Sequence, residues 1–239
     1  MYFAISLLSI STHMLLLFTL SPHISADSLN SELYSIDENP FGVPYGTWIA
    51  RWWNWTTGIP AGDHPRDIEE KPCNVNQKWD KVWFLPDVLD GKFVRNCEIP
   101  NGTAIFVPIT TGEKSVAEDK DLVGKDPNVV KRDLIAGAYY CDNSNVERSA
   151  AVDGRRISGL EGNLPYRTNT SDVFNLSWNE ANIYNVKPIE DRRAFAEGWF
   201  LFVKPLPQGN HTIDLQSKIS HTDEECNYDG TIRWNIKVK

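Results

Sequence analysis

The sequence predicts a mainly β fold, a β-sandwich with two helical additions. Three observations predict it. Short apolar or alternating segments recur along the chain, turn-forming Gly, Pro and Asp-Gly residues separate them, and only two segments have helical periodicity. With 41% hydrophobic and 23% charged residues among 239, the composition is that of a globular protein. Immunoglobulin-like and jelly-roll-like sandwiches both fit this pattern.

Residues 1–26 have the pattern of a secretory signal peptide. They contain no Lys, Arg, Asp or Glu, their centre is apolar, and they end on the small residue Ala26. An uncleaved anchor is the alternative, but polar residues interrupt the apolar run before the ~18–20 residues that a spanning helix needs. We therefore expect a secreted or cell-surface protein, with residues 27–239 as one sandwich domain and no later membrane span.

Residues 47–56 predict the first helix. Tryptophans recur there at i, i+4 and i+7, which places them on one helical face: Trp48, Trp52 and Trp55. Thr47 is placed to cap the start of this helix, and Gly58 is placed to end it.

Three strands are expected in the first half. Residues 82–85 are short and apolar, and Asp90-Gly91 is a hairpin signal that leads into the alternating segment 92–97. Residues 103–109 are apolar on both faces, which indicates a central strand. Pro108 predicts a bulge or an edge within it, because proline has no N–H to donate.

The rest of the chain predicts one more helix and then mostly strands. Residues 129–140 have apolar residues on one side and follow Asp126-Pro127, a favourable helix entry. The expected β segments are 149–157, a hairpin that turns at Asp153-Gly154, and 172–177, 198–203, 211–215 and 232–238. A split into two domains near residue 145 is the alternative organisation.

Four cysteines predict two disulfides, because an even number in an exported chain is typical of a disulfide framework. We favour Cys73–Cys97, which closes a short loop, and Cys141–Cys226, which ties the middle of the chain to its last strand. Four free thiols or a metal cluster are the alternative, but no Cys-x-x-Cys pair supports a zinc site.

Five Asn-x-Ser/Thr sequences are candidate N-glycosylation sites. An acceptor asparagine must be exposed for modification, and several such sequences arise by chance in an Asn-rich chain. The sites are Asn54, Asn101, Asn169, Asn175 and Asn210.

Several short motifs occur in an order that resembles a known family. The main motifs are Trp52-Trp53-Asn54-Trp55, Val82-Trp83-Phe84-Leu85, Val152-Asp153-Gly154 and the segment 205–213. Together they resemble a family of exported bacterial and archaeal proteins of unknown function. The resemblance implies the same β-sandwich and supplies no activity.

The negative net charge restricts the classes of partner that we expect. With 24 Lys and Arg against 32 Asp and Glu, the chain carries a charge of −8. Nucleic acids and anionic membranes need a basic surface, so both are disfavoured. A glycan, a small molecule or an envelope protein remains as the expected partner.

Trp53 and Trp55 are the candidate ligand contacts. Four tryptophans within eight residues cannot all face one core stripe, and Trp53 points away from the other three. An exposed indole could stack on a sugar ring. The alternative is that the helix buries its whole circumference.

His64 is the centre of a candidate metal or acid–base site. It lies in Asp63-His64-Pro65-Arg66-Asp67, with more carboxylates following. A solvated polar loop is the alternative. His211, which alternates in phase with apolar residues, is expected to be a hydrogen-bonded core histidine, and His221 is expected in an exposed loop.

Asp119 and Asp121 begin a partial calcium-loop pattern. Positions one, three and six of that pattern match, but Val123 and Val130 occupy positions five and twelve, where oxygen ligands are needed. A charged surface loop is the alternative. Calcium is the one cofactor that the sequence leaves open.

We expect a non-catalytic module that binds a ligand or glycan, because the chain lacks the common catalytic motifs of serine hydrolases, zinc proteases and nucleotide-binding enzymes. The alternative is an extracellular hydrolase that uses the His64 site or a carboxylate pair. Glu113 and Asp153, each beside an expected strand end, are candidate members of such a pair.

Overall fold

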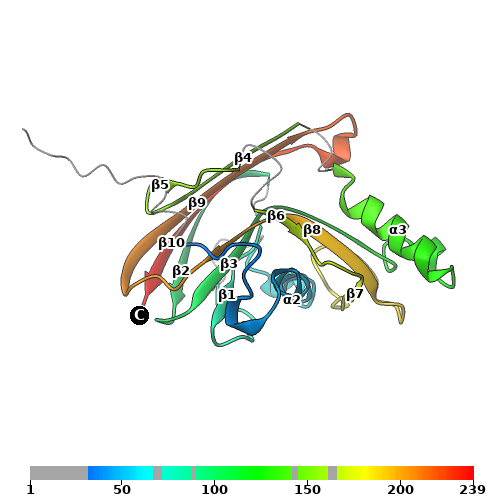
Figure 1. Cartoon of the computed structure of the whole chain (residues 1–239), viewed down its shortest axis with the longest axis horizontal. Coiled ribbons are helices and arrows are strands. Elements are labelled where there is room, and N and C mark those ends of the chain that lie inside the picture. Colours follow the sequence, from blue (N-terminus) through cyan, green and yellow to red (C-terminus); the bar gives the residue numbers. More distant parts are fainter. Residues whose placement is uncertain (1–31, 67–71, 88–89, 142–144, 161–165) are drawn as a thin grey trace, which may run out of the picture.

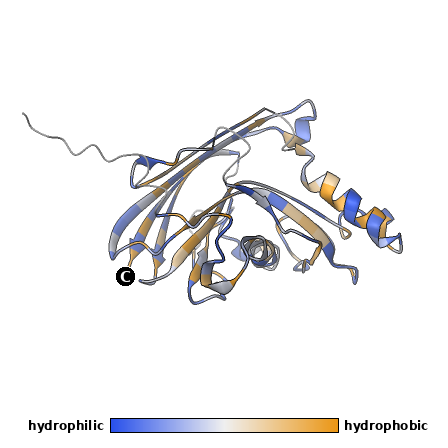
Figure 2. Cartoon of the chain, viewed as in Figure 1, coloured by the Kyte–Doolittle hydropathy of each residue, from blue (hydrophilic) through white to orange (hydrophobic). Residues whose placement is uncertain are grey.

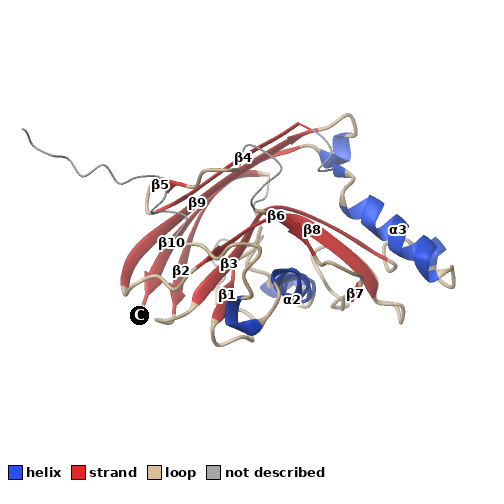
Figure 3. Cartoon of the chain, viewed as in Figure 1, coloured by secondary structure: helices blue, strands red, loops and turns tan. Residues whose placement is uncertain are grey.

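The computed structural model describes residues 32–66, 72–87, 90–141, 145–160 and 166–239, so the predicted signal peptide lies outside the described residues. Two five-stranded sheets face each other, and two α-helices pack against one of them (Figure 1, Figure 3). This arrangement confirms a mainly β sandwich with two helical additions. Four short 3₁₀ helices also occur among the described residues: η1 Pro40–Gly42, η2 Ala61–Asp63, η3 Lys120–Leu122 and η5 Glu224–Cys226.

Sheet A has the strand order β1-β3-β8-β6, and β7 pairs with the other end of β8. The β1–β3 pair is parallel and the other pairs are antiparallel. The strands are β1 Val82–Phe84, β3 Ala104–Ser115, β6 Arg167–Asn169, β7 Phe174–Asn175 and β8 Arg193–Val203.

Sheet B has the strand order β2-β10-β9-β4-β5. Its β2–β10 pair is parallel and its other pairs are antiparallel. The strands are β2 Gly91–Ile99, β4 Asn145–Val152, β5 Arg155–Arg156, β9 Gly209–Ser220 and β10 Tyr228–Val238. Both sheets thus combine strands from the first and second halves of the chain.

The Asp90-Gly91 hairpin prediction is wrong. Strand β1 pairs with β3 in sheet A, whereas β2 begins at Gly91 and pairs with β10 in sheet B. The chain therefore crosses between the sheets here. The carboxylate of Asp90 accepts a hydrogen bond from the N–H of Asp229 at 3.0 Å, which fixes the start of β2 beside β10.

Sheet A is buried on both faces, as the apolar segment 103–109 predicts. One face meets the alternating apolar residues of sheet B, and the other meets the first helix. Figure 2 shows the alternation of hydrophobic and hydrophilic residues along sheet B. The β3–β8 register shifts between Pro108 and Thr110, which confirms the predicted bulge.

Helix α2, Tyr45–Thr57, lies across the face of sheet A that points away from sheet B (Figure 1). Trp52 Nε1 donates to the carbonyl of Leu85 at 2.8 Å, and this bond anchors the helix to the end of β1. The helix ends at Gly58 as predicted. It begins before Thr47, however, so Thr47 is not its cap; Pro44 holds that position.

Helix α3, Pro127–Ala138, packs on β3 and β8 through a small core of its own. The carboxylate of Asp126 caps it by accepting the N–H of Asn128 at 2.9 Å. The main chain of Gly112 in β3 lies so close to the carbonyl of Ala138 that a side chain there would collide with it.

Both predicted disulfides are confirmed. Cys73–Cys97 joins the loop before β1 to β2, and Cys141–Cys226 joins the chain after α3 to η5. Two disulfides in a small β-rich chain are typical of extracellular proteins. Among the described residues, no helix is long and apolar enough to cross a membrane.

Candidate functional site

The outer face of sheet B, the side that points away from sheet A, is hollowed in two places. The first hollow, of about 680 Å³, lies over β4, β9 and β10 beside Arg156 of β5. The second, of about 520 Å³, lies over β9, β10 and β2 beside the β4–β5 turn. Their outward-facing residues alternate along the strands with residues of the core between the sheets.

The register of sheet B arranges these outward side chains in rows. Thr212, Asn235 and Asn96 lie opposite one another on β9, β10 and β2. Asn235 Nδ2 donates to Asn96 Oδ1 at 3.1 Å. Ser149, Gln216 and Thr231 form another row, on β4, β9 and β10. Rows that are two residues apart along a strand are separated by about 7 Å, so a ligand of several linked rings could contact more than one.

Small side chains on β4 make the first hollow. Ala151 lies opposite Asp214, and Ser149 lies opposite Gln216. Because neither small residue fills the space above its strand, the longer side chains of β9 and Arg156 form the sides of the hollow.

Several charges on this face are already paired. Arg233 binds Asp214 through both carboxylate oxygens, with Nη2–Oδ2 at 3.0 Å. Lys239 binds Glu98. Because these charges bind each other, the hydrogen-bonding groups that remain in the neighbouring rows are mainly side-chain amides and hydroxyls. Such groups can both donate to and accept from an uncharged hydroxyl.

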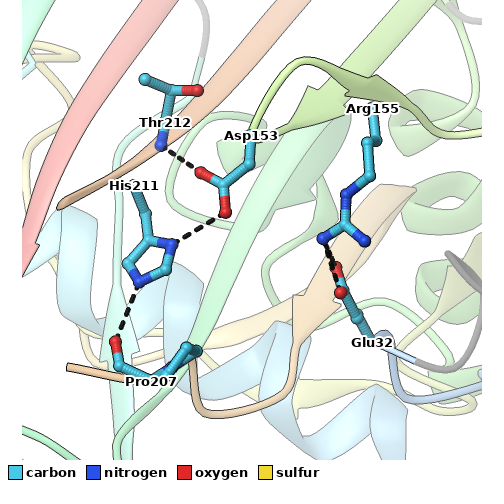
Figure 4. Close-up of polar contacts among 6 residues, drawn as sticks. All are labelled: Glu32, Asp153, Arg155, Pro207, His211 and Thr212. Atoms are coloured by element: carbon cyan, nitrogen blue, oxygen red, sulfur yellow. Dashed lines mark hydrogen bonds and ion pairs between the residues drawn. The ribbon is translucent and has the colours of Figure 1, made fainter. Parts of the chain in front are cut away.

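A histidine–carboxylate contact lies beside the second hollow, at one end of the outer face of sheet B (Figure 4). His211 Nδ1 lies 2.8 Å from Asp153 Oδ2, and His211 Nε2 lies 2.8 Å from the carbonyl of Pro207. Both partners are hydrogen-bond acceptors, so the ring can donate to both of them only in its protonated, imidazolium form. Burial lowers the pKa of His211, but the bonds to Asp153 and Pro207 outweigh burial, so its pKa is raised.

Asp153, the carboxylate partner of His211, lies in the β4–β5 turn. Asp153 and Gly154 both have positive φ, which confirms the predicted Asp-Gly turn. The other carboxylate oxygen of Asp153 accepts the N–H of Thr212 at 2.8 Å. Beside the turn, Arg155 donates to both oxygens of Glu32, at 2.5 and 2.7 Å (Figure 4). The turn is therefore fixed to β9 and to the start of the described chain.

Trp53 and Trp55 do not lie on a surface, so the prediction that they contact a sugar is wrong. Trp55 is fully buried and Trp53 is 6% exposed. Trp53 packs edge-on against Trp52 and also contacts the ring of Tyr184. The segment after β7, which includes Trp178 and Tyr184, packs against the side of α2 that carries Trp53, so the helix is buried on more than its sheet-facing side, while Thr47 stays exposed.

His64 is buried and has both ring nitrogens in hydrogen bonds. Nδ1 accepts the N–H of Arg66 at 3.1 Å, so Nε2 carries the proton and donates to Thr56. Burial, and then the nearby charge of Arg66, lower the pKa of His64 to about 4. The ring is therefore a neutral structural group with no nitrogen left to bind a metal. The predicted neighbour Asp67 lies outside the described residues.

Asp121 lies in η3 and Asp119 caps its start, where the carboxylate of Asp119 accepts the N–H of Asp121 at 3.2 Å. Across the ranges that the structure describes, no group of three or more His, Cys, Asp or Glu residues is placed to hold a metal ion.

The two candidate carboxylates are not paired with each other. Glu113 belongs to β3 in sheet A, where burial and then the charge of Glu118 raise its pKa. Glu118 accepts both the N–H and the hydroxyl of Ser115, each at 2.8 Å. Asp153 lies in the turn between β4 and β5 of sheet B and contacts His211.

Three of the five candidate glycosylation sites are exposed: Asn101, Asn175 and Asn210. The other two use their amide nitrogens internally. Asn54 Nδ2 donates to the carbonyls of Ala50 and Asn175, and Asn169 Nδ2 donates to the hydroxyl of Tyr139.

Comparisons with known proteins identify no relative by sequence. No family model matches the chain, and no curated protein matches it. Among solved structures, it is similar to the cysteine protease inhibitor EhICP2 from Entamoeba histolytica. That match has 11% identity, a TM-score of 0.22, and coverage of 66% of this chain and 96% of the inhibitor. A score this low supports no transfer of function.

Sequence reasoning missed the polar rows on sheet B. The alternation of residues 211–215 and 232–238 predicts one solvent-facing side for each strand. Nothing local indicates that β2 lies parallel to β10, and this pairing is what places Asn96 beside Asn235.

Proposed function

We propose that this protein is a secreted, non-catalytic module that binds a glycan or a similar hydroxyl-rich ligand on the outer face of sheet B. The observation that supports it best is the pair of hollows over this face, crossed by rows of amide and hydroxyl side chains. The two disulfides fit the extracellular setting in which such ligands occur.

The chemistry of the face favours an uncharged polyol over a charged ligand. Asp214 is paired with Arg233, and Asp153 lies in hydrogen-bond contact with His211. Asn96, Asn235 and the neighbouring hydroxyls offer donors and acceptors at regular intervals across three strands. Binding sites fix a ligand's orientation through a small number of such polar groups.

The histidine beside the face supports a binding role. Both ring nitrogens of His211 are held by acceptors, so the ring has no free nitrogen to remove a proton from a substrate. His211 instead holds the β4–β5 turn against the corner between β8 and β9. This turn borders the second hollow.

Glycan-array screening of the oxidised protein, followed by calorimetry with the strongest hit, tests the proposal. Each of the substitutions Asn235→Ala and Gln216→Ala removes one amide from a row and should weaken binding by about three- to tenfold. The exposed amide of Asn128, at the start of α3, provides the matched control Asn128→Ala, which should leave binding unchanged. Failure to bind any glycan, or equal affinity in all the variants, would contradict the proposal.

A further inference from the structure

A third hollow, of about 200 Å³, lies on sheet A and is separate from the outer face of sheet B. It is formed by the end of β3, the residues after β7 and the residues that lead into β8. Its polar lining consists of Ser115, Ser177, Trp178, Asp191 and Arg192, and apolar side chains complete it. At ~30 Å³ for each water molecule in the liquid, the space holds about six or seven waters.

Main-chain bonds fix the framework of this hollow. The N–H of Leu176 donates to the carbonyl of Arg192 at 2.8 Å, and the N–H of Val116 donates to the carbonyl of Arg193 at 2.9 Å. The N–H of Ser177 donates to the side chain of Asn54 on α2 at 3.0 Å. The polar residues are thus held by three elements and not by one loop.

Residues that line the hollow carry hydrogen-bond donors without partners in the described part of the chain. The indole N–H of Trp178 is buried and has no hydrogen-bond partner in the described part of the chain. Arg192 donates once, from Nη1 to Ser177 Oγ at 3.3 Å. Because that oxygen accepts from Arg192, the hydroxyl proton of Ser177 is available to another acceptor. Buried donors normally have partners, so an unpaired one indicates a place for an acceptor.

The charges in the hollow favour an anion with a single negative charge. Asp191 is committed to Arg193, at 2.6 and 2.9 Å, whereas Arg192 has no carboxylate partner among the described residues. The carboxylate of Glu118 accepts a hydrogen bond from the hydroxyl of Ser115, which lines the hollow. A ligand with two negative charges would be repelled by Glu118 more strongly than a ligand with one.

We propose that this hollow binds the carboxylate group of a small organic acid. The guanidinium of Arg192 supplies the charge and a planar pair of donors that match a carboxylate. The indole N–H of Trp178 and the hydroxyl of Ser177 supply the remaining donors, and the apolar lining accepts a short hydrocarbon part. This site is independent of the proposed glycan-binding face.

Indole N–H signals in the two-dimensional NMR spectrum of the ¹⁵N-labelled protein test this proposal. The chain has nine tryptophans, and the signal that Trp178→Phe removes is that of Trp178. Titration with sodium propionate should shift this signal saturably, whereas sodium chloride at equal ionic strength should not. Arg192→Gln should weaken the binding by about tenfold or more. The control Arg132→Gln, at an exposed arginine on α3, should leave it unchanged.

The remaining eight indole signals report whether each variant is folded. If Arg192→Gln perturbs them, Ser177→Ala provides a second variant, which should weaken propionate binding several-fold. The proposal is overturned if propionate does not shift the Trp178 signal or shifts it equally in wild type and Arg192→Gln. It is also overturned if phosphate binds more tightly than propionate, because a doubly charged anion would then be the better fit.

Discussion

His211 connects segments that are far apart in the sequence. It binds Asp153 in the β4–β5 turn and Pro207 in the corner between the two sheets. The phase of His211 along β9 predicts a hydrogen-bonded core histidine, and the structure confirms the hydrogen bonds but leaves the residue half-buried and outside the core. The sequence could not indicate which groups accept these hydrogen bonds. Asp153 is 58 residues away from His211 and reaches it only because β4 pairs with β9.

The stability that the His211 contact contributes should depend on pH. A histidine whose pKa is raised on folding stabilises the protein fully below its unfolded pKa, and this contribution is lost as the pH rises through the folded pKa. Urea unfolding of wild type and His211→Gln should therefore differ most near pH 5.5, and the difference should shrink by pH 8.5. A difference that stays constant or grows with pH would contradict the charged pair.

His64 should have the opposite pH dependence, because burial lowers its pKa from 6.5 to about 4. The folded protein holds this ring neutral, so its contribution is complete above pH 6.5 and is lost as the pH falls towards 4. Such a shift corresponds to about 3 kcal/mol at the acid end. The stability advantage of wild type over His64→Gln should therefore be larger at pH 7 than at pH 4.5. Titration of the His64 ring near pH 6.5 by NMR would rule this out.

At the scale of elements, local patterns predicted most helices and strands but not every neighbour. The apolar segment 103–109 predicted a central strand and its bulge, because two apolar faces require two covered faces. The burial of Trp53 could not be read from α2, since the covering segment lies more than 120 residues further along the chain. The Asp90-Gly91 signal correctly marked the start of β2 and wrongly indicated its partner.

The contact between α3 and β3 makes a prediction at this scale. A methyl group at Gly112 would collide with the carbonyl of Ala138, at the end of α3. Gly112→Ala should therefore lower the free energy of unfolding by about 1–3 kcal/mol. Gly62→Ala is the matched control, because a methyl group there meets nothing within 4 Å. Equal unfolding midpoints for the two variants would show that α3 does not pack on β3 in this way.

At the scale of the whole molecule, the two disulfides restrict the unfolded chain to different extents. Cys73–Cys97 spans 24 residues, whereas Cys141–Cys226 spans 85. In the chain-entropy description, removal of the longer link costs about 1 kcal/mol more than removal of the shorter one. Denaturant unfolding of the two double Cys→Ser variants measures this difference. A larger loss from the shorter link would show that folded-state contacts, and not chain entropy, dominate.

The fold class and most elements followed from composition and periodicity, because these depend on local residues, whereas the two disulfides were favoured pairings that the structure confirms. The candidate binding face did not follow from local patterns, because it is assembled by strand pairing. Asn96 and Asn235 are 139 residues apart and meet only through the parallel β2–β10 pair. The sequence instead indicated the tryptophans as ligand contacts, but they form the core between helix α2 and sheet A.

NMR mapping of the labelled protein with the strongest glycan from the array tests the proposed binding of a hydroxyl-rich ligand on the outer face of sheet B. The proposal predicts that the side-chain amide signals of Asn96, Asn235 and Gln216 shift together and saturate, while signals from α2 and α3 stay in place. Shifts confined to any other surface, with these three amides unchanged, would contradict it.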